Sequence, residues 1–108
     1  MDDPLLTAID AADRAMVLAV LAAAEVATQF DELEQCLLQA RAALTTEESI
    51  LRSLYASRYN GHIISVLEND VTWKQSLLDA IPLGPSSDQL RAVAVLLKTK
   101  PFLQTFPS

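Results

Sequence analysis

The sequence has little cysteine and little glycine, and each shortage excludes a class of site. Its 108 residues include a single cysteine, Cys36, so no disulfide framework can form within the chain. A lone cysteine fits a reducing compartment, and we expect an intracellular, cytoplasmic location, with a nuclear one also compatible. The only two glycines, Gly61 and Gly84, are too far apart to form a glycine-rich phosphate loop.

Long apolar runs and an excess of positive charge are also missing. The longest uncharged apolar run, Ala15 to Ala24, has about half of the ~20 residues that a membrane-spanning helix needs, and the N-terminus lacks the basic start of a secretion signal. We therefore predict no membrane span. The formal net charge of −6 repels phosphate backbones, and the basic residues form no run, so we predict no nucleic-acid partner.

Apolar residues are abundant. Hydrophobic residues make up 51% of the chain and charged residues 20%, with a mean hydropathy of +0.24. A chain of this length buries about two-thirds of its surface in one core, which predicts a single helical domain over residues 1–108. The ends, residues 1–3 and 101–108, are expected to be flexible or docked on a partner. So much apolar surface in a small domain also predicts contact with another protein or with a second copy of the chain.

Leucine and alanine dominate the sequence, and proline is absent between Pro4 and Pro82, a composition typical of helices. Capping boxes, in which a short polar residue is followed three positions later by Glu or Gln, occur at Asp31, Thr45 and Ser86. With the apolar periodicity they predict an all-α fold, either a compact bundle or a short helical-repeat-like array of about six helices. The expected helices cover roughly residues 4–29, 31–44, 45–60, 62–69, 72–81 and 86–100.

The first expected helix is unusual because it presents no polar side chain from Ala15 to Ala24. Such a helix must be covered on most of its sides. Large residues such as Met16 and Val20 lie on one side, and a ridge of alanines lies opposite. We expect other helices of the same chain, or a partner, to cover this ridge. The alanine ridge consists of Ala8, Ala12, Ala15, Ala19 and Ala22.

The sequence contains little reactive chemistry. One histidine, His62, and one cysteine are too few for a closed zinc site, and no calcium-binding loop is present, so we predict no metal and no cofactor. No serine lies in a Gly-x-Ser-x-Gly elbow, and the leucines after Cys36 favour a buried, unreactive thiol. The segment Glu68-Asn69-Asp70 has the composition of a polar turn. We predict that the protein is not an enzyme.

Two groups of residues are candidates for contact with a partner. The first is a set of Arg and Tyr residues at helical spacing in the third expected helix, and both residue types are common in binding hot spots. The second is a pair of aromatic residues in the C-terminal tail, where chains usually fray. The alternative is that both groups belong to the flank of the protein's own core. The candidates are Arg52, Tyr55, Arg58, Tyr59, Phe102 and Phe106.

These observations favour a non-enzymatic protein–protein interaction module. A scaffold subunit, an adaptor or a dedicated chaperone would bind its partner through an apolar helical surface, and the basic excess of residues 49–108 would suit an acidic partner segment. The alternative is a small regulatory enzyme or a ligand-binding helical bundle. A flat or grooved apolar patch would suit a protein partner, whereas a closed cavity with convergent polar groups would suit a small ligand.

Overall fold

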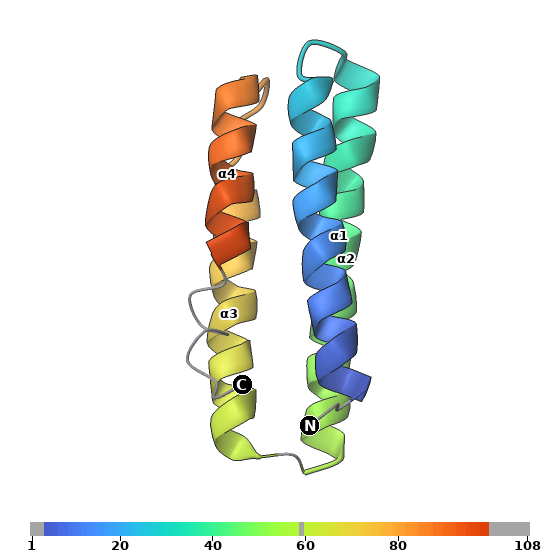
Figure 1. Ribbon diagram of the computed structural model, residues 1–108, viewed down its shortest axis with the longest axis vertical. Coiled ribbons are helices and arrows are strands. Elements are labelled where there is room, and N and C mark those ends of the chain that lie inside the picture. The colour runs from blue at the N-terminus through green and yellow to red at the C-terminus, as the bar shows by residue number, and fades with distance from the viewer. Residues whose placement is uncertain (1–3, 59, 100–108) are drawn as a thin grey trace.

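Residues 4–58 and 60–99 form four α-helices that run alternately up and down in a bundle measuring 45 × 21 × 21 Å (Figure 1). The computed structural model describes residues 4–58 and 60–99. All regular structure within these residues is helical, which confirms the all-α prediction and, of the two architectures, the bundle. The helices are α1 (Pro4–Glu25), α2 (Phe30–Ala56), α3 (Gly61–Asp79) and α4 (Ser87–Thr99).

The helices pack mainly on their neighbours in the bundle. α1 packs on α2 and α4, α3 packs chiefly on α2, and α1 and α3 face each other diagonally (Figure 1). Two contacts hold the start of α4 beside the end of α1: the Ser87 hydroxyl donates to the Ala24 carbonyl at 2.7 Å, and Arg91 lies 3.7 Å from Glu25. Because α4 is the shortest helix, it lies along only the upper half of the bundle in Figure 1.

The prediction of about six helices is wrong, because two expected breaks lie inside continuous helices. α2 continues through Thr45, whose hydroxyl donates to the Arg41 carbonyl one turn earlier at 3.1 Å instead of capping a new helix. α3 likewise continues through Glu68-Asn69-Asp70, so the polar turn predicted there is wrong. Short polar side chains bond readily to the backbone of their own helix, so the spacing of a capping box does not by itself start a new helix.

Two of the helix starts use side-chain caps. The capping box predicted at Ser86 is confirmed, since its backbone N–H donates to Gln89 Oε1 at 2.9 Å and the Gln89 N–H donates to Ser86 Oγ at 3.1 Å. Asn60 Oδ1 caps α3 by accepting from the backbone N–H groups of His62 and Ile63. These caps satisfy N–H groups that have no partner within the helix.

The break expected near Phe30 is present, although its details differ from the prediction. α1 ends at Glu25, and a short turn leads to Gln29, whose side chain makes no cap bond at the start of α2. The capping box expected at Asp31 is therefore not the start of this helix, and Asp31 instead lies in its first turn. An acidic residue there stabilises the helix through its dipole without a specific bond.

The apolar core consists of two clusters along the bundle. The larger, upper cluster lies among all four helices and includes Met16 and Val20, both fully buried. The smaller, lower cluster consists of Ile9, Leu54, Ile64 and Leu67 with partly buried neighbours. Nine of the 22 residues of α1 are buried, so this helix is less enclosed than expected, and the alanine ridge is only partly covered. Ala12 and Ala19 are buried, whereas Ala15 and Ala22 are exposed.

Candidate functional site

A cluster of four charged residues lies in the centre of the bundle, between the two apolar clusters. Asp13 comes from α1, Glu47 from α2, and Asp70 and Lys74 from α3, and none of the four side chains is more than 2% exposed. Lys74 Nζ donates to all three carboxylates, with the Glu47 Oε1 contact at 2.8 Å. One ammonium therefore links three helices, including the diagonal pair α1 and α3.

The charges in this cluster do not balance. Three ionised carboxylates around one ammonium would leave a net charge of −2 in the core, which is costly to bury. Burial raises the pKa of Glu47 from an ordinary value of 4.5 to about 8; Lys74 opposes this shift, and the charge of Asp13 reinforces it. Glu47 is therefore mostly protonated at neutral pH, which reduces the buried excess charge.

The lysine responds in the opposite way to its surroundings. Burial by itself would lower the pKa of Lys74, but the carboxylates of Glu47 and Asp13 outweigh burial and raise the pKa above its ordinary value. Lys74 thus stays charged. The three carboxylates offer ligand atoms within 4.8 Å of one another, a spacing that suits a cation, and the ammonium of Lys74 is the cation that they contact. The cluster joins α1, α2 and α3 through this one buried ammonium.

Sequence reasoning missed this cluster, although two signals were present. Asp13 lies between Ile9 and Met16 on the buried side of α1, where an acidic residue requires a partner. Asp70 and Lys74 have the i,i+4 spacing of a helical ion pair. Neither signal identifies Glu47, because the partners of a buried charge depend on which helices meet.

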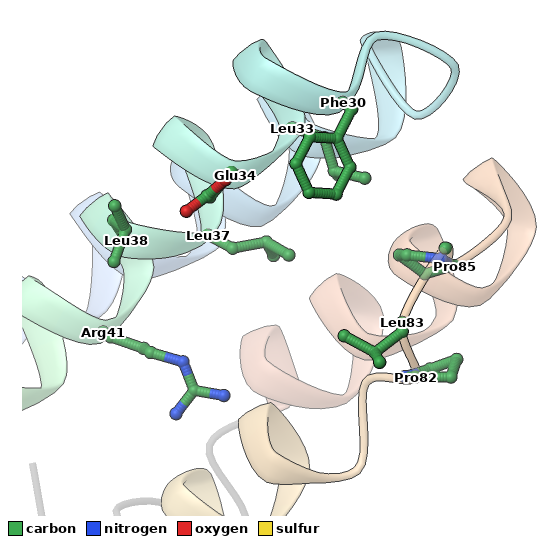
Figure 2. A pocket seen from close by; sticks show the side chains of 10 residues that line it. Phe30, Leu33, Glu34, Leu37, Leu38, Arg41, Pro82, Leu83 and Pro85 are labelled. Atoms are coloured by element: carbon green, nitrogen blue, oxygen red, sulfur yellow. The ribbon is translucent and has the colours of Figure 1, made fainter.

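An apolar groove lies between the first half of α2 and the loop that joins α3 to α4. Its volume is about 300 Å³, and Figure 2 shows Phe30 and Leu37 of α2 facing Leu83 across it. Phe30 is 71% exposed and Leu83 is fully exposed, so the groove is open to solvent. The loop turns at Gly84, whose φ of 69° favours glycine. The remaining lining residues are Leu33, Glu34, Leu38, Arg41, Pro82 and Pro85.

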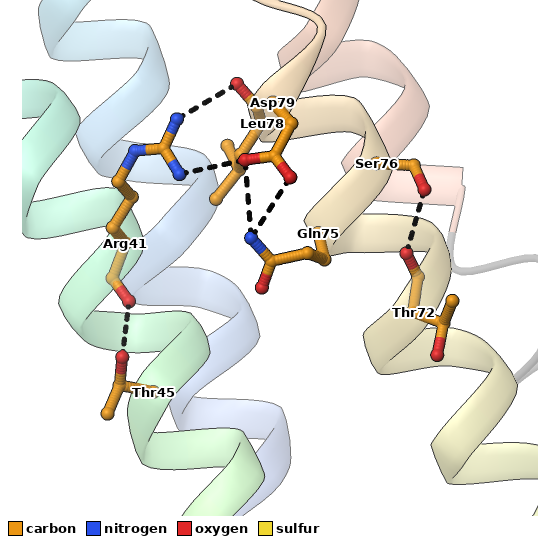
Figure 3. Close-up of polar contacts among 7 residues, drawn as sticks. All are labelled: Arg41, Thr45, Thr72, Gln75, Ser76, Leu78 and Asp79. Carbon is orange, nitrogen blue, oxygen red and sulfur yellow. Dashed lines mark hydrogen bonds and ion pairs between the residues drawn. The ribbon is translucent and has the colours of Figure 1, made fainter.

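A polar clamp holds the loop side of this groove in place. Arg41 of α2 donates to Asp79 Oδ1 at 3.0 Å and to the Leu78 carbonyl at 3.4 Å, and Gln75 donates to the same carboxylate (Figure 3). The hydrogen bonds from Arg41 and Gln75 lower the pKa of Asp79. The clamp fixes the end of α3 against α2 and so determines where the groove-forming loop begins.

A second apolar surface lies on the outer side of α1 and α4. Leu18 is 66% exposed, Val95 is 60% exposed, and Leu21, one turn after Leu18, is 36% exposed. A depression of about 390 Å³ on this surface is lined by Val17, Leu18 and Leu21 of α1. Charged residues also line it, and one of these, Lys98, belongs to α4. The helix that the sequence predicts to be covered on most sides thus keeps one uncovered apolar face.

The predicted partner-contact residues that the structure describes lie away from both of these surfaces. Arg52 and Tyr55 are exposed near the end of α2, and Arg58 follows in the turn with a positive φ of 54°. The Tyr55 hydroxyl donates to the Glu68 carboxylate, so this ring links α2 to α3. Three predicted contact residues lie outside the described residues: Tyr59, Phe102 and Phe106.

No family model matches the sequence, and no curated protein or solved structure is similar enough to indicate a relative. None of the helices in the described part of the chain has the length and apolarity that crossing a bilayer requires. The thiol of Cys36, predicted to be buried, is half-buried against the upper core cluster. Function must therefore be argued from the surfaces and the cluster described above.

Proposed function

We propose that this protein is a non-enzymatic interaction module that binds an apolar segment of another protein in the groove between α2 and the α3–α4 loop. The observation that carries the proposal is the joint exposure of Phe30, Leu38 and Leu83 around this one groove. Folded proteins rarely leave large apolar side chains grouped on their surface unless something covers them. Burial of this surface would supply the binding free energy.

The shape of the groove favours a protein segment over a small molecule. Its volume of about 300 Å³ is at the lower limit of small-ligand pockets, which run from ~300 to ~1,000 Å³. It is an open trough, and its polar residues, Glu34 and Arg41, are both exposed. We expect the partner to insert one or two large apolar side chains, presented by a helix or an extended loop.

A binding experiment with matched variants tests this function. A partner captured by the wild-type protein and then purified should lose affinity for Leu83→Asp and Phe30→Asp by at least about tenfold, because each change puts a charge into the contact. Leu96→Asp, an equivalent change at an exposed position of α4 far from the groove, should bind normally. Equal binding by Leu83→Asp and the wild type would place the interface elsewhere.

The contact residues predicted from the sequence provide a competing interface in the same experiment. Arg52, Tyr55 and Arg58 lie at the opposite end of α2 from the groove. If alanine variants at these three positions weaken binding while Leu83→Asp does not, the partner uses that end of the bundle. If alanine variants at Tyr59, Phe102 or Phe106 weaken binding instead, the interface is the one predicted from the sequence and not the groove. Binding of a small amphiphile at the groove, in place of any protein, would favour the ligand-binding bundle.

A further inference from the structure

The uncovered face of α1 carries a regular stripe of exposed residues. Arg14, Leu18, Leu21 and Glu25 follow one another at intervals of four, three and four residues, the spacing of a helix–helix seam. Leu18 is 66% exposed, and the side chains of Arg14 and Glu25 are 76% and 75% exposed. The stripe thus has two leucines in the middle and opposite charges at its two ends.

We propose that this stripe pairs with the same stripe of a second copy of the chain, in antiparallel orientation about a two-fold axis. The axis would pass between positions 19 and 20 of α1. Leu18 then faces Leu21 of the second copy, and Arg14 faces Glu25 of the second copy, because each pair is equally spaced about that midpoint. A two-fold axis repeats every contact, so one dimer contains the Leu18–Leu21 pair twice and the Arg14–Glu25 pair twice.

Charge distribution supports a second copy as the occupant of this face. Lys98 of α4 lines the same depression and adds positive charge at the Arg14 end. At the Glu25 end, Arg91 of α4 lies 3.7 Å from Glu25 and 3.8 Å from Asp88, so two acidic side chains there outnumber one basic side chain. In an antiparallel pair the positive end of each copy meets the negative end of the other, whereas a parallel pair would bring like charges together.

The charged ends already have partners within the chain, but these contacts can be exchanged. Arg14 pairs with Asp10 at 2.9 Å, and Glu25 lies 3.7 Å from Arg91. Both are exposed ion pairs, which contribute little in water, so pairing across the two-fold axis loses almost nothing. The small apolar area of the face implies a weak dimer, with a Kd in the micromolar range.

Sedimentation equilibrium of the full chain, from low micromolar to near-millimolar concentration, tests the proposal. The wild type should show a monomer–dimer equilibrium. Leu18→Asp should raise the dimer Kd by at least about tenfold, because the charge appears twice in the contact. Leu96→Asp, on an exposed part of α4 outside the stripe, is the matched control and should dimerise like the wild type.

Charge reversal tests the antiparallel register directly. Arg14→Glu and Glu25→Arg should each weaken the dimer by about tenfold, since each places like charges opposite one another. The double variant Arg14→Glu/Glu25→Arg should return to within about threefold of the wild type, because the opposite pairing is restored. Circular dichroism of each variant is the control, and it should show that these exposed substitutions leave the helices intact.

Three results would overturn the inference. A wild type that stays monomeric at all concentrations excludes the dimer, and single charge reversals without effect exclude this face. Single reversals that weaken the dimer without rescue by the double variant exclude the antiparallel register. The α2 groove shares no residue with the stripe, so the outcome is separate from that of the partner-binding experiment.

Discussion

The upper and lower halves of the bundle are stabilised differently. The upper cluster packs alanine, valine and leucine from four helices, whereas the lower cluster has only four buried apolar residues from three helices. The charged cluster of Asp13, Glu47, Asp70 and Lys74 lies between them. Because a buried ion cluster often contributes no more stability than apolar packing of the same volume, we infer that the charged cluster has a different role from the two apolar clusters.

We interpret that role as fixing the register of the helices. Apolar side chains tolerate sliding by a helical turn, because one leucine can replace another in the packing. A shift of α3 relative to α1 and α2 would instead separate Lys74 from Asp13 and Glu47 and leave buried charges without partners. The cluster thus raises the free energy of every alternative helix register by more than it lowers the free energy of the native register.

The largest expected effect comes from placing a charge in the upper cluster. Val20→Asp puts a carboxylate at a fully buried position with apolar neighbours and should unfold the domain, because an isolated buried charge costs several kcal/mol. Leu18→Asp, two residues earlier on the exposed face, is the control and should leave the fold intact. A cooperative thermal melt of Val20→Asp within a few degrees of the wild type would contradict the assignment of α1 to the core.

The next largest effect comes from removing the cation of the charged cluster. Lys74→Met leaves three buried carboxyl groups without their shared partner and should lower the free energy of unfolding by about 3–5 kcal/mol, measured by urea denaturation. Lys98→Met, at an exposed lysine of α4, should change it by less than about 0.5 kcal/mol. Similar stabilities for both variants would mean that the cluster is not paired as described.

Replacing the whole cluster separates its stabilising role from its specifying role. With Lys74→Met and leucine at the three carboxylate positions, stability should equal the wild type or exceed it by about 1–4 kcal/mol. If the cluster fixes register, this variant should also show more than one packing of α3 in its NMR spectrum. A less stable variant with a single set of sharp signals would reverse our interpretation.

A smaller effect follows from the pH dependence of the same cluster. The pKa of Glu47 is about 8 when folded and near 4.5 in an ordinary carboxyl, so its contribution to stability is complete below pH 4.5 and is lost as the pH rises through 8. We expect a loss on the order of 2 kcal/mol between pH 6 and pH 9. Glu47→Gln resembles the protonated acid and should remove most of this loss.

The charged groups around Glu47 define the control for this prediction. Glu47 is faced by Asp13 of α1 and by Asp70 and Lys74 of α3. On α4, Lys98 lines the same surface depression as Asp13. The pKa of Lys74 is raised, so its contribution persists throughout this pH range. Glu34→Gln, at an exposed position of α2, should keep the alkaline loss, and a flat wild-type profile from pH 6 to pH 9 would contradict the prediction.

The smallest effect is expected at the exposed clamp beside the groove. Asp79→Asn should lower the Tm only slightly near neutral pH, because its ion pair with Arg41 is open to water. Because the pKa of Asp79 is lowered in the folded state, its carboxylate contributes to stability at pH values above the ordinary pKa of an aspartate. This contribution is lost as the pH falls through the pKa of Asp79 in the folded protein. The difference between variant and wild type should therefore vanish in acid. A difference that grows in acid would contradict this assignment.

Local signals in the sequence were reliable where the partner groups are close along the chain. The Ser86–Gln89 capping box formed as predicted because all of its bonds lie within one turn. The same reasoning was wrong at Thr45, where α2 runs without a break from the upper apolar cluster, past Glu47 of the charged cluster, to the lower apolar cluster. Tertiary packing made the longer helix more favourable than two capped ones.

The sequence by itself determined the helical class, the burial of the Met16 and Val20 side of α1 and the excess of apolar surface, because these depend on composition and on the 3.6-residue period. Only the tertiary structure decided that there are four helices, that three carboxylates share one lysine, and that apolar residues from α2 and a distant loop form one groove. The physical reason is that the partners of a buried charge, and the residues that form one surface with an exposed leucine, lie on other helices. Helix packing determines which residues these are.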